Sequence, residues 1–199
     1  IAPACPILEC GGYLMDQERI ERAVKELLAG IGAEQLNEEV IANSPHRIAA
    51  MYAEFFRDID RDPTDVLEVL YQERYEEMIV MRDIPFFSIC EHHFLPFVGT
   101  ADIVYIPKAG RIVGASKLAR AVDIAAGRPQ LQERLTQQVA DALVKKLDPM
   151  GVLVRIQATH LCMTLRGVRK AGATMVTSAI RGSFYRDQAS RSEALSLIG

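Results

Sequence analysis

Residues 78–107 read MIVMRDIPFFSICEHHFLPFVGTADIVYIP, and this stretch decides the fold class. Apolar residues recur at about every second position, so that Ala101, Ile103 and Tyr105 share one side of a strand while polar Asp102 lies on the other. A period of two is typical of a β-strand with one buried face. The stretch therefore predicts two strands, MIVMRDIPFFSIC and VGTADIVYIP.

Helical patterns precede these strands. Apolar residues spaced three and four apart predict a helix from about Asp16. We expect a second helix with Ser44 as N-cap and Pro45 at its first position. A short third helix is expected over 65–71 with Thr64 as its cap.

Two helices and two more strands are predicted after the first pair of strands. The helices should cover 116–127, with Ser116 as the cap, and 131–147, where leucines recur at a spacing of four. Alternating patterns then predict strands within 151–163 and 172–185.

The predicted order is three helices followed by ββααββ. This order indicates an α+β fold in which an antiparallel sheet is preceded by a helical segment. We expect an N-terminal helical extension over 1–75 and a domain that carries the chemistry over 76–199.

Composition and charge exclude several classes of protein. The chain has 199 residues with 26 acidic and 23 basic side chains, a net charge of −3 and a pI near 5.9. A basic surface for nucleic acid is not expected from this balance. No stretch approaches the roughly 18 apolar residues of a membrane span, and the N-terminus lacks the basic region of a signal peptide. We therefore expect a cytoplasmic protein with no nucleic-acid or membrane partner.

Cysteine and histidine occur together at one turn. Cys90-Glu91-His92-His93 contains a Cys-x-x-His pair, and Cys162 can supply a third ligand. Two thiolates and an imidazole suit zinc, and three protein ligands leave a fourth position for water, whose pKa bound zinc lowers toward about 7. The alternative stays open that the cysteines are core residues and the histidines lie on the surface.

His160 and Cys162 stand two residues apart in a predicted strand. Alternate strand residues point the same way, so His160 is expected beside this metal ligand.

A candidate anion site begins the helix predicted over 116–127. Ser116, Lys117 and Arg120 bring free backbone N–H groups and two cations to one helix start, which suits a phosphate. The alternative is a solvated basic face behind a serine cap. Taken alone, Glu133 and Arg166 indicate no role.

Longer motifs resemble the GTP cyclohydrolase I family. Their order and spacing are those of the family, and the resemblance covers most of the chain after residue 15. The four motifs are FFSICEHHFLPFVG (86–99), VGASKLARAVD (113–123), RPQLQERLTQQ (128–138) and THLCMTLRGV (159–168). Two weaker similarities are SPHRIAAMY (44–52) and SRSEALSLI (190–198).

The resemblance implies roles for the cysteines and histidines. It implies one zinc ion per subunit, with Cys90, His93 and Cys162 as ligands. His92 and His160 would then be the proton-transfer pair.

The resemblance also implies how a substrate would be held. Glu133, with neighbouring Gln132, would bind N1 and the exocyclic amine of guanine, and Ser116 would lie at the ribose. The residues implied to bind the triphosphate are Lys117, Arg120, Arg166 and, from another subunit, Arg47.

The implied activity is the opening of the imidazole ring of GTP, which gives formate and 7,8-dihydroneopterin triphosphate for pterin and folate biosynthesis. The implied architecture is the tunnelling fold, assembled as a decamer of two pentamers with active sites at subunit interfaces. Thr100 and Ala50 stand where the family often has basic residues, which leaves details of the triphosphate contact open. Two alternatives remain: a ring-opening paralog that serves a deazapurine or specialised pathway, and a paralog that binds nucleotide without turnover.

Overall fold

The computed structural model describes residues 15–32 and 35–199. The chain divides into two compact units, a first up to Glu54 and a second from Phe55 to Gly199. Two of the four cysteines, Cys5 and Cys10, lie outside the described residues.

The first unit contains helix α1 (Gln17–Gly30) and nearly all of helix α2 (Glu38–Phe55). The Asp16 carboxylate caps α1, because it accepts a hydrogen bond from the Arg19 N–H at 2.8 Å. The predicted start of the first helix is therefore confirmed.

The prediction that the second helix begins at Ser44 is wrong. Helix α2 is continuous from Glu38, and Pro45 lies inside it. The Asn37 side chain accepts from the Glu39 N–H at 2.8 Å and acts as the cap that was assigned to Ser44. In a helix interior proline removes one i→i−4 hydrogen bond and its ring crowds the carbonyl of residue i−4, which is why the sequence favours a helix start here; α2 nevertheless continues through Pro45.

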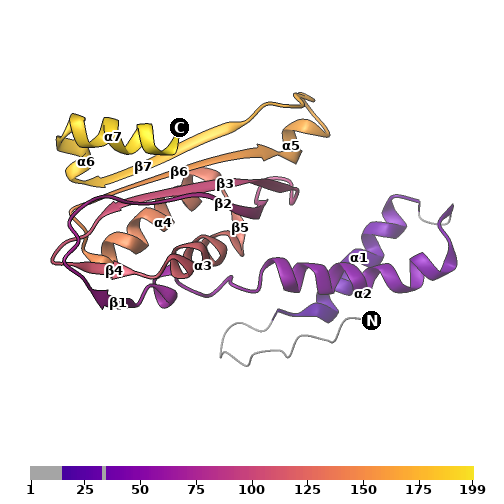
Figure 1. Ribbon diagram of the computed structural model, residues 1–199. Coiled ribbons are helices and arrows are strands. Elements are labelled where there is room, and N and C mark those ends of the chain that lie inside the picture. Colours follow the sequence, from indigo (N-terminus) through magenta and orange to yellow (C-terminus); the bar gives the residue numbers. More distant parts are fainter. Residues whose placement is uncertain (1–14, 33–34) are drawn as a thin grey trace. The chain divides into compact units, whose positions relative to one another are not determined.

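A five-stranded sheet lies at the centre of the second unit (Figure 1). Its order is β5-β2-β3-β6-β7, and neighbours are antiparallel except that short β5 runs parallel to β2. The strands are β2 (Ile79–Cys90), β3 (Pro96–Ile106), β5 (Pro129–Gln130), β6 (Gly151–His160) and β7 (Met175–Gly182). The four long strands lie where the alternating patterns predict them, and the α+β fold class is confirmed.

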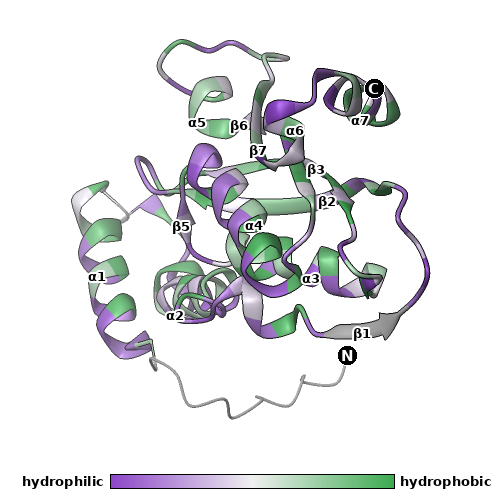
Figure 2. Cartoon of the chain, turned by 90° about the vertical axis from the view of Figure 1, so that its left-hand side faces the viewer, coloured by the Kyte–Doolittle hydropathy of each residue, from purple (hydrophilic) through white to green (hydrophobic). Residues whose placement is uncertain are grey.

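Helices α3 (Ala115–Ala126) and α4 (Gln132–Leu147) pack against one face of this sheet (Figure 1). On α4, Leu135, Val139 and Leu143 are fully buried in the core that the two helices share with the strands. Figure 2 shows hydrophobic and hydrophilic residues on the same helix α4. Burying each of these side chains contributes about 1.5–3 kcal/mol to the stability of the fold. The buried face of α4 therefore determines how the helix is placed against the sheet.

Ser116 does not cap α3, contrary to the prediction. The N-cap is Gly114, whose carbonyl accepts from the Lys117 N–H at 2.8 Å, and Ser116 is the second residue of the helix. Serine at an N-cap stabilises a helix by only about 1 kcal/mol. Here the short connection from strand β4 (Arg111–Val113) places the N-cap residue, which has an extended backbone, at Gly114, two positions before Ser116.

The opposite face of the sheet is partly covered by α6 (Ser183–Arg186) and α7 (Gln188–Ile198) (Figure 1). Val104, Leu153 and Phe184 form a second core beneath these helices. Burial along β3 and β6 is therefore continuous rather than alternating.

Asp102 lies on this second face and is buried, although its side of the strand was predicted to be polar. Its carboxylate accepts from the Arg155 guanidinium at 2.9 Å and from the Asp83 N–H at 2.9 Å. A buried carboxylate needs such partners, and those partners lie far away in sequence.

Two short elements replace the predicted third helix. A 3₁₀ helix, η2 (Pro63–Val66), is capped by Asp62 rather than Thr64. Strand β1 (Val69–Gln72) then pairs with β4 in a separate two-stranded sheet.

Strand β6 ends at His160, and Cys162 lies in the one-turn helix α5 (Leu161–Thr164). The prediction that His160 and Cys162 share a strand face is therefore wrong. The turn of α5 nevertheless keeps the two side chains on one side of the sheet end, as the site geometry shows.

Asp62 links the stability of η2 to pH. The hydrogen bond from the Thr64 N–H, assisted by Lys145, lowers the pKa of Asp62 from 3.8 to about 2. Because its pKa is lower in the folded than in the unfolded chain, Asp62 stabilises the fold at pH values above its pKa in the unfolded chain. This stabilisation is lost as the pH falls through the pKa of Asp62 in the folded chain.

We expect Asp62→Ala to lower the free energy of unfolding by about 1 kcal/mol at neutral pH, the usual value of an N-cap. The deficit should shrink as the pH falls from about 4 to 2. Asp62→Asn keeps an acceptor without a charge, so its deficit at neutral pH should be smaller, and its own free energy of unfolding should lack the change that Asp62 contributes between about pH 4 and 2. Urea unfolding across this pH range measures both, and a deficit that does not change with pH would contradict the assignment.

Among the described residues, no helix has both the length and the apolar character needed to cross a bilayer.

Candidate active site

The turn after β2 presents the Cys-x-x-His pair. The Cys90 N–H donates to the Leu95 carbonyl and the Phe94 N–H donates to the Cys90 carbonyl, each at 2.9 Å. Phe94 has a φ of 52°, which closes the turn. The Glu91 N–H donates to the Gln130 carbonyl, so β5 holds the other side of the turn.

Cys90, His160 and Cys162 come together at the end of the sheet. One ligand atom from each lies within 4.8 Å of the others. Cys90 is buried and the other two are half-buried. Two sulfurs and an imidazole nitrogen are the donor set of a zinc site, and a distance of this size fits ligands around one ion.

Ionisation of the Cys162 thiol is unfavourable in the absence of a cation. Burial and the neighbouring Cys90 raise its pKa, while Arg166 acts in the opposite direction. A divalent cation between the two sulfurs would reverse this balance and hold both as thiolates.

His93, the predicted third ligand, does not join this group in the structure. Its Nε2 accepts a hydrogen bond from Arg166 Nη1 at 2.5 Å. His92 Nδ1 lies 3.9 Å from Cys90 Sγ. Of the predicted ligand set, the structure thus brings Cys90 and Cys162 together, with His160 in the place expected for His93.

His160 is held on two sides. Its ring stacks parallel to Phe97, with centroids 4.6 Å apart, and Phe97 faces it across the β3–β6 ladder. Its Nε2 lies 2.9 Å from Gln132 Oε1. Burial lowers the pKa of His160, and the Glu133 carboxylate opposes that shift, so Glu133 lies within electrostatic range of the ring.

Gln132 is buried at the start of α4 and is already fully hydrogen bonded. The two protons of its Nε2 are shared among three acceptors, the carbonyls of Ile156 and Met175 and Thr177 Oγ1. The side chain therefore contacts His160 and the sheet, whereas the resemblance implied a contact with guanine. Sequence reasoning missed Phe97 and Thr177, because nothing in their local pattern distinguishes them from other strand residues.

An ion pair joins the turn after β2 to α4. Arg134 donates to both carboxylate oxygens of Glu91, at 2.7 and 3.2 Å. These hydrogen bonds lower the pKa of Glu91. Glu133 precedes Arg134 and is exposed, so its carboxylate is accessible beside the turn.

The predicted triphosphate residues come from three places. Ser116 and Arg120 are exposed and Lys117 is half-buried in the first turns of α3. Arg166 follows α5 and contacts His93. Arg47 lies in the first unit on α2, where it donates to Glu39 at 2.7 Å.

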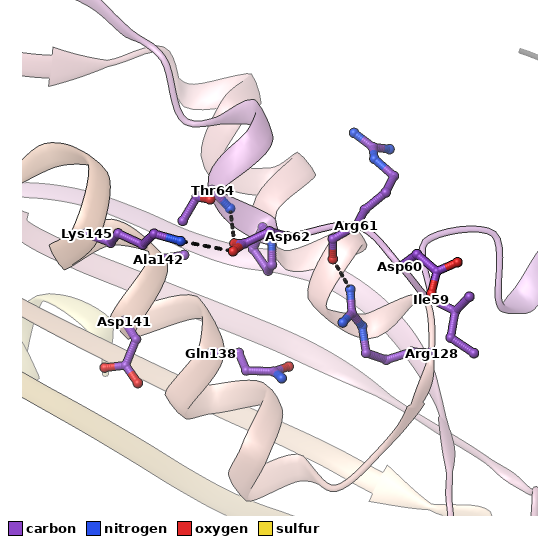
Figure 3. Close-up of a pocket in the computed structure, with 11 residues that line it drawn as sticks. Ile59, Asp60, Arg61, Asp62, Thr64, Arg128, Gln138, Asp141, Ala142 and Lys145 are labelled. Carbon is purple, nitrogen blue, oxygen red and sulfur yellow. Dashed lines mark hydrogen bonds and ion pairs between the residues drawn. The ribbon is translucent and has the colours of Figure 1, made fainter. Parts of the chain in front are cut away.

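A pocket of about 350 Å³ lies elsewhere in the second unit (Figure 3). Among the described residues, those that line it include none of the predicted site residues. Two of the basic side chains in its walls have partners within the pocket: Lys145 pairs with Asp62, and Arg128 donates to the Arg61 main-chain carbonyl (Figure 3). These interactions indicate a structural role for its walls.

Comparison with known proteins gives consistent results. The family model described as GTP cyclohydrolase I matches residues 20–199. "GTP cyclohydrolase 1" of Clostridioides difficile is 51% identical over 185 residues, covering 92% of this chain and 97% of that protein. "GTP cyclohydrolase 1" of Thermoanaerobacter pseudethanolicus is 49% identical over 185 residues, covering 93% and 98%.

Proposed function

This chain belongs to the GTP cyclohydrolase I family, and from that premise we propose how its residues convert GTP into formate and 7,8-dihydroneopterin triphosphate. The observation that carries the proposal is the convergence of Cys90, Cys162 and His160 at one end of the sheet, within electrostatic range of Glu133. The convergence joins a metal donor set, a proton carrier and a base-recognition carboxylate.

Zinc is the metal that this donor set fits. Cys90 and Cys162 would hold it, together with His93 as the resemblance implies. When bound, zinc supplies a Lewis acid that makes water a nucleophile near neutral pH.

Glu133 would recognise the base. Guanine presents N1–H and an exocyclic amine side by side, and an ionised carboxylate can accept from both. Adenine has an unprotonated N1, which would face the same carboxylate with a lone pair.

His92 and His160 would move the protons. Water adds at C8 of guanine, the imidazole ring opens to a formamide, and a second hydrolysis releases formate. A histidine with a pKa near the working pH can both donate and accept during these steps and during the later ribose rearrangement and closure of the pterin ring. Ser116 would lie at the ribose.

The triphosphate would be held by Lys117, Arg120 and Arg166, with Arg47 from another subunit. Such a shared site requires an oligomer, and the resemblance implies a decamer of two pentamers with active sites between subunits. Pairing sheet edges between subunits would also cover their free N–H and C=O groups. We further propose a cytoplasmic location and the division into a helical extension over 1–75 and a catalytic domain over 76–199.

The direct test is incubation of the purified chain with GTP. We expect formate in the medium and a pterin that becomes fluorescent after oxidation, with one zinc per subunit by metal analysis. Binding of GTP with neither product would contradict the proposal.

We expect His92→Ala and His160→Ala to retain zinc and to lower kcat by about 100-fold or more, the usual contribution of a general acid or base. Steady-state kinetics with metal analysis of the same preparations measures both. A normal kcat in either variant would remove that histidine from the proton path.

Arg166→Ala should raise the KM for GTP by at least about 10-fold, equivalent to about 1.4 kcal/mol, with zinc content unchanged. Arg166→Lys should recover only part of the loss, because lysine cannot bind phosphate through two parallel N–H groups. The KM for GTP should also rise with ionic strength through screening. Equal turnover of guanosine and GTP would show that these cations do not bind the triphosphate.

A further inference from the structure

The orientation of the Gln132 side chain is determined by its surroundings. Its Nε2 faces the Ile156 and Met175 carbonyls, each at 3.0 Å, and Thr177 Oγ1 at 3.1 Å. A rotated amide would place Oε1 against two carbonyl oxygens, which only accept. Since Gln132 has no exposed surface, water cannot relieve that repulsion. Oε1 must therefore face His160.

Two threonines close a ring of hydrogen bonds around this amide. Thr136 Oγ1 donates to the main-chain carbonyl of Gln132 at 2.7 Å. This bond uses the only proton of the Thr136 hydroxyl. Thr177 must then be the donor in the 2.6 Å contact between the two hydroxyls. Thr177 Oγ1 can in turn accept from Gln132 Nε2, whose two protons are shared among this hydroxyl and the two main-chain carbonyls.

The hydrogen bonds around Gln132 determine which nitrogen of His160 has a free lone pair. Gln132 Oε1 can only accept, so the His160 Nε2 at 2.9 Å must carry a proton and donate it. In the neutral imidazole, Nδ1 is then the nitrogen with a free lone pair. Stacking on Phe97 fixes the plane of the ring, and the hydrogen bond fixes its rotation within that plane.

We propose that Gln132 is a positioning residue for His160, fixed by Thr136 and Thr177, and that it directs Nδ1 toward the reacting groups. The proposal rests on the proposed function, in which His160 acts in turnover. It gives Gln132 a role through His160 and not through the guanine base. Partners of this kind commonly change activity by about 10- to 100-fold.

The test is a double-mutant cycle in saturating zinc. Gln132→Met keeps the length of the side chain and removes the acceptor. We expect its kcat to fall about 10- to 100-fold with KM for GTP within about 2-fold of the native value. His160→Ala and the double variant should have the same kcat, because Gln132 has nothing left to position. This equality holds whether His160 moves protons or contacts the metal. Gln137→Met, an exposed position on the same helix, is the matched control and should be normal.

The two proposals fail in different ways. A normal kcat in His160→Ala would overturn the role of His160 itself. A slow His160→Ala with a normal Gln132→Met would overturn only the positioning role, as would an additive double variant or a loss confined to KM.

A second pair of variants decides the matter if Gln132→Met does not fold. Thr177→Val removes the hydroxyl that accepts from the amide and keeps the side-chain shape. It should lower kcat by about 3-fold or more, without further loss in the His160→Ala background, and Thr177→Ser should restore the rate. A Thr177→Val enzyme with native kcat, or one that serine does not rescue, would contradict the proposed ring.

Discussion

Replacing Cys162 with alanine should remove the zinc and lower kcat for GTP by at least about 1000-fold. Activation of water by the metal contributes several kcal/mol, and each 1.36 kcal/mol is a factor of ten in rate. The lone Cys90 thiol cannot compensate, because thiolate ligands provide much of the affinity for zinc. Metal analysis and formate release measure the two losses. Met163→Ala, on the neighbouring exposed residue of α5, should keep both zinc and activity.

The third ligand can be determined in the same assay. The resemblance implies His93, while the structure places His160 with the two sulfurs. Loss of zinc from His93→Ala with retention by His160→Ala supports the implied set, and the reverse result makes His160 the ligand. Full zinc occupancy in Cys162→Ala would overturn the metal assignment altogether.

Replacing Glu133 with alanine should lower kcat/KM for GTP by at least about 100-fold. Two hydrogen bonds to a charged acceptor are lost, each contributing about 1.5–3 kcal/mol. The native enzyme should prefer GTP over ATP by about 10⁴-fold, since a site that hydrogen bonds specific donors rejects an analogue that lacks them. The alanine variant should lose most of this preference along with its activity.

Comparison of both nucleotides in both enzymes measures the role of Glu133. Glu133→Gln keeps the shape, can accept only one of the two bonds and should be intermediate. Glu193→Ala removes an exposed carboxylate of α7 and serves as the control. An unchanged GTP preference in Glu133→Ala would assign base recognition to another group.

The strands and the two sheet-packing helices could be predicted because their patterns depend on burial alone. Leu135, Val139 and Leu143 of α4 recur at a spacing of four, and alternate residues of β6 face the core that α3 and α4 share with the sheet. Helix starts were harder to predict. Ser44 and Ser116 are good caps by residue type, yet the chain geometry placed the caps at Asn37 and Gly114.

The site could be predicted in part for a related reason. Cys90, Cys162 and His160 are chemically distinctive, so their types and order identify them. The surroundings of Gln132 depend on β7, which joins the sheet more than forty residues later, as its hydrogen bond to Thr177 shows. A local pattern carries no information about such a contact. The rotation of His93 toward Arg166 is likewise a matter of two side chains and not of spacing.

The ion pair between Glu91 and Arg134 has a consequence for how this site can evolve. It ties the turn that carries His92, the proposed proton carrier, to the residue next to Glu133, the proposed base-recognition carboxylate. A change at either position alone leaves its partner's charge uncompensated, and lysine at position 134 loses the two-pronged contact. In directed evolution toward a different purine, these two positions should therefore be randomised as a pair, so that each replacement is tested beside a partner of matching charge.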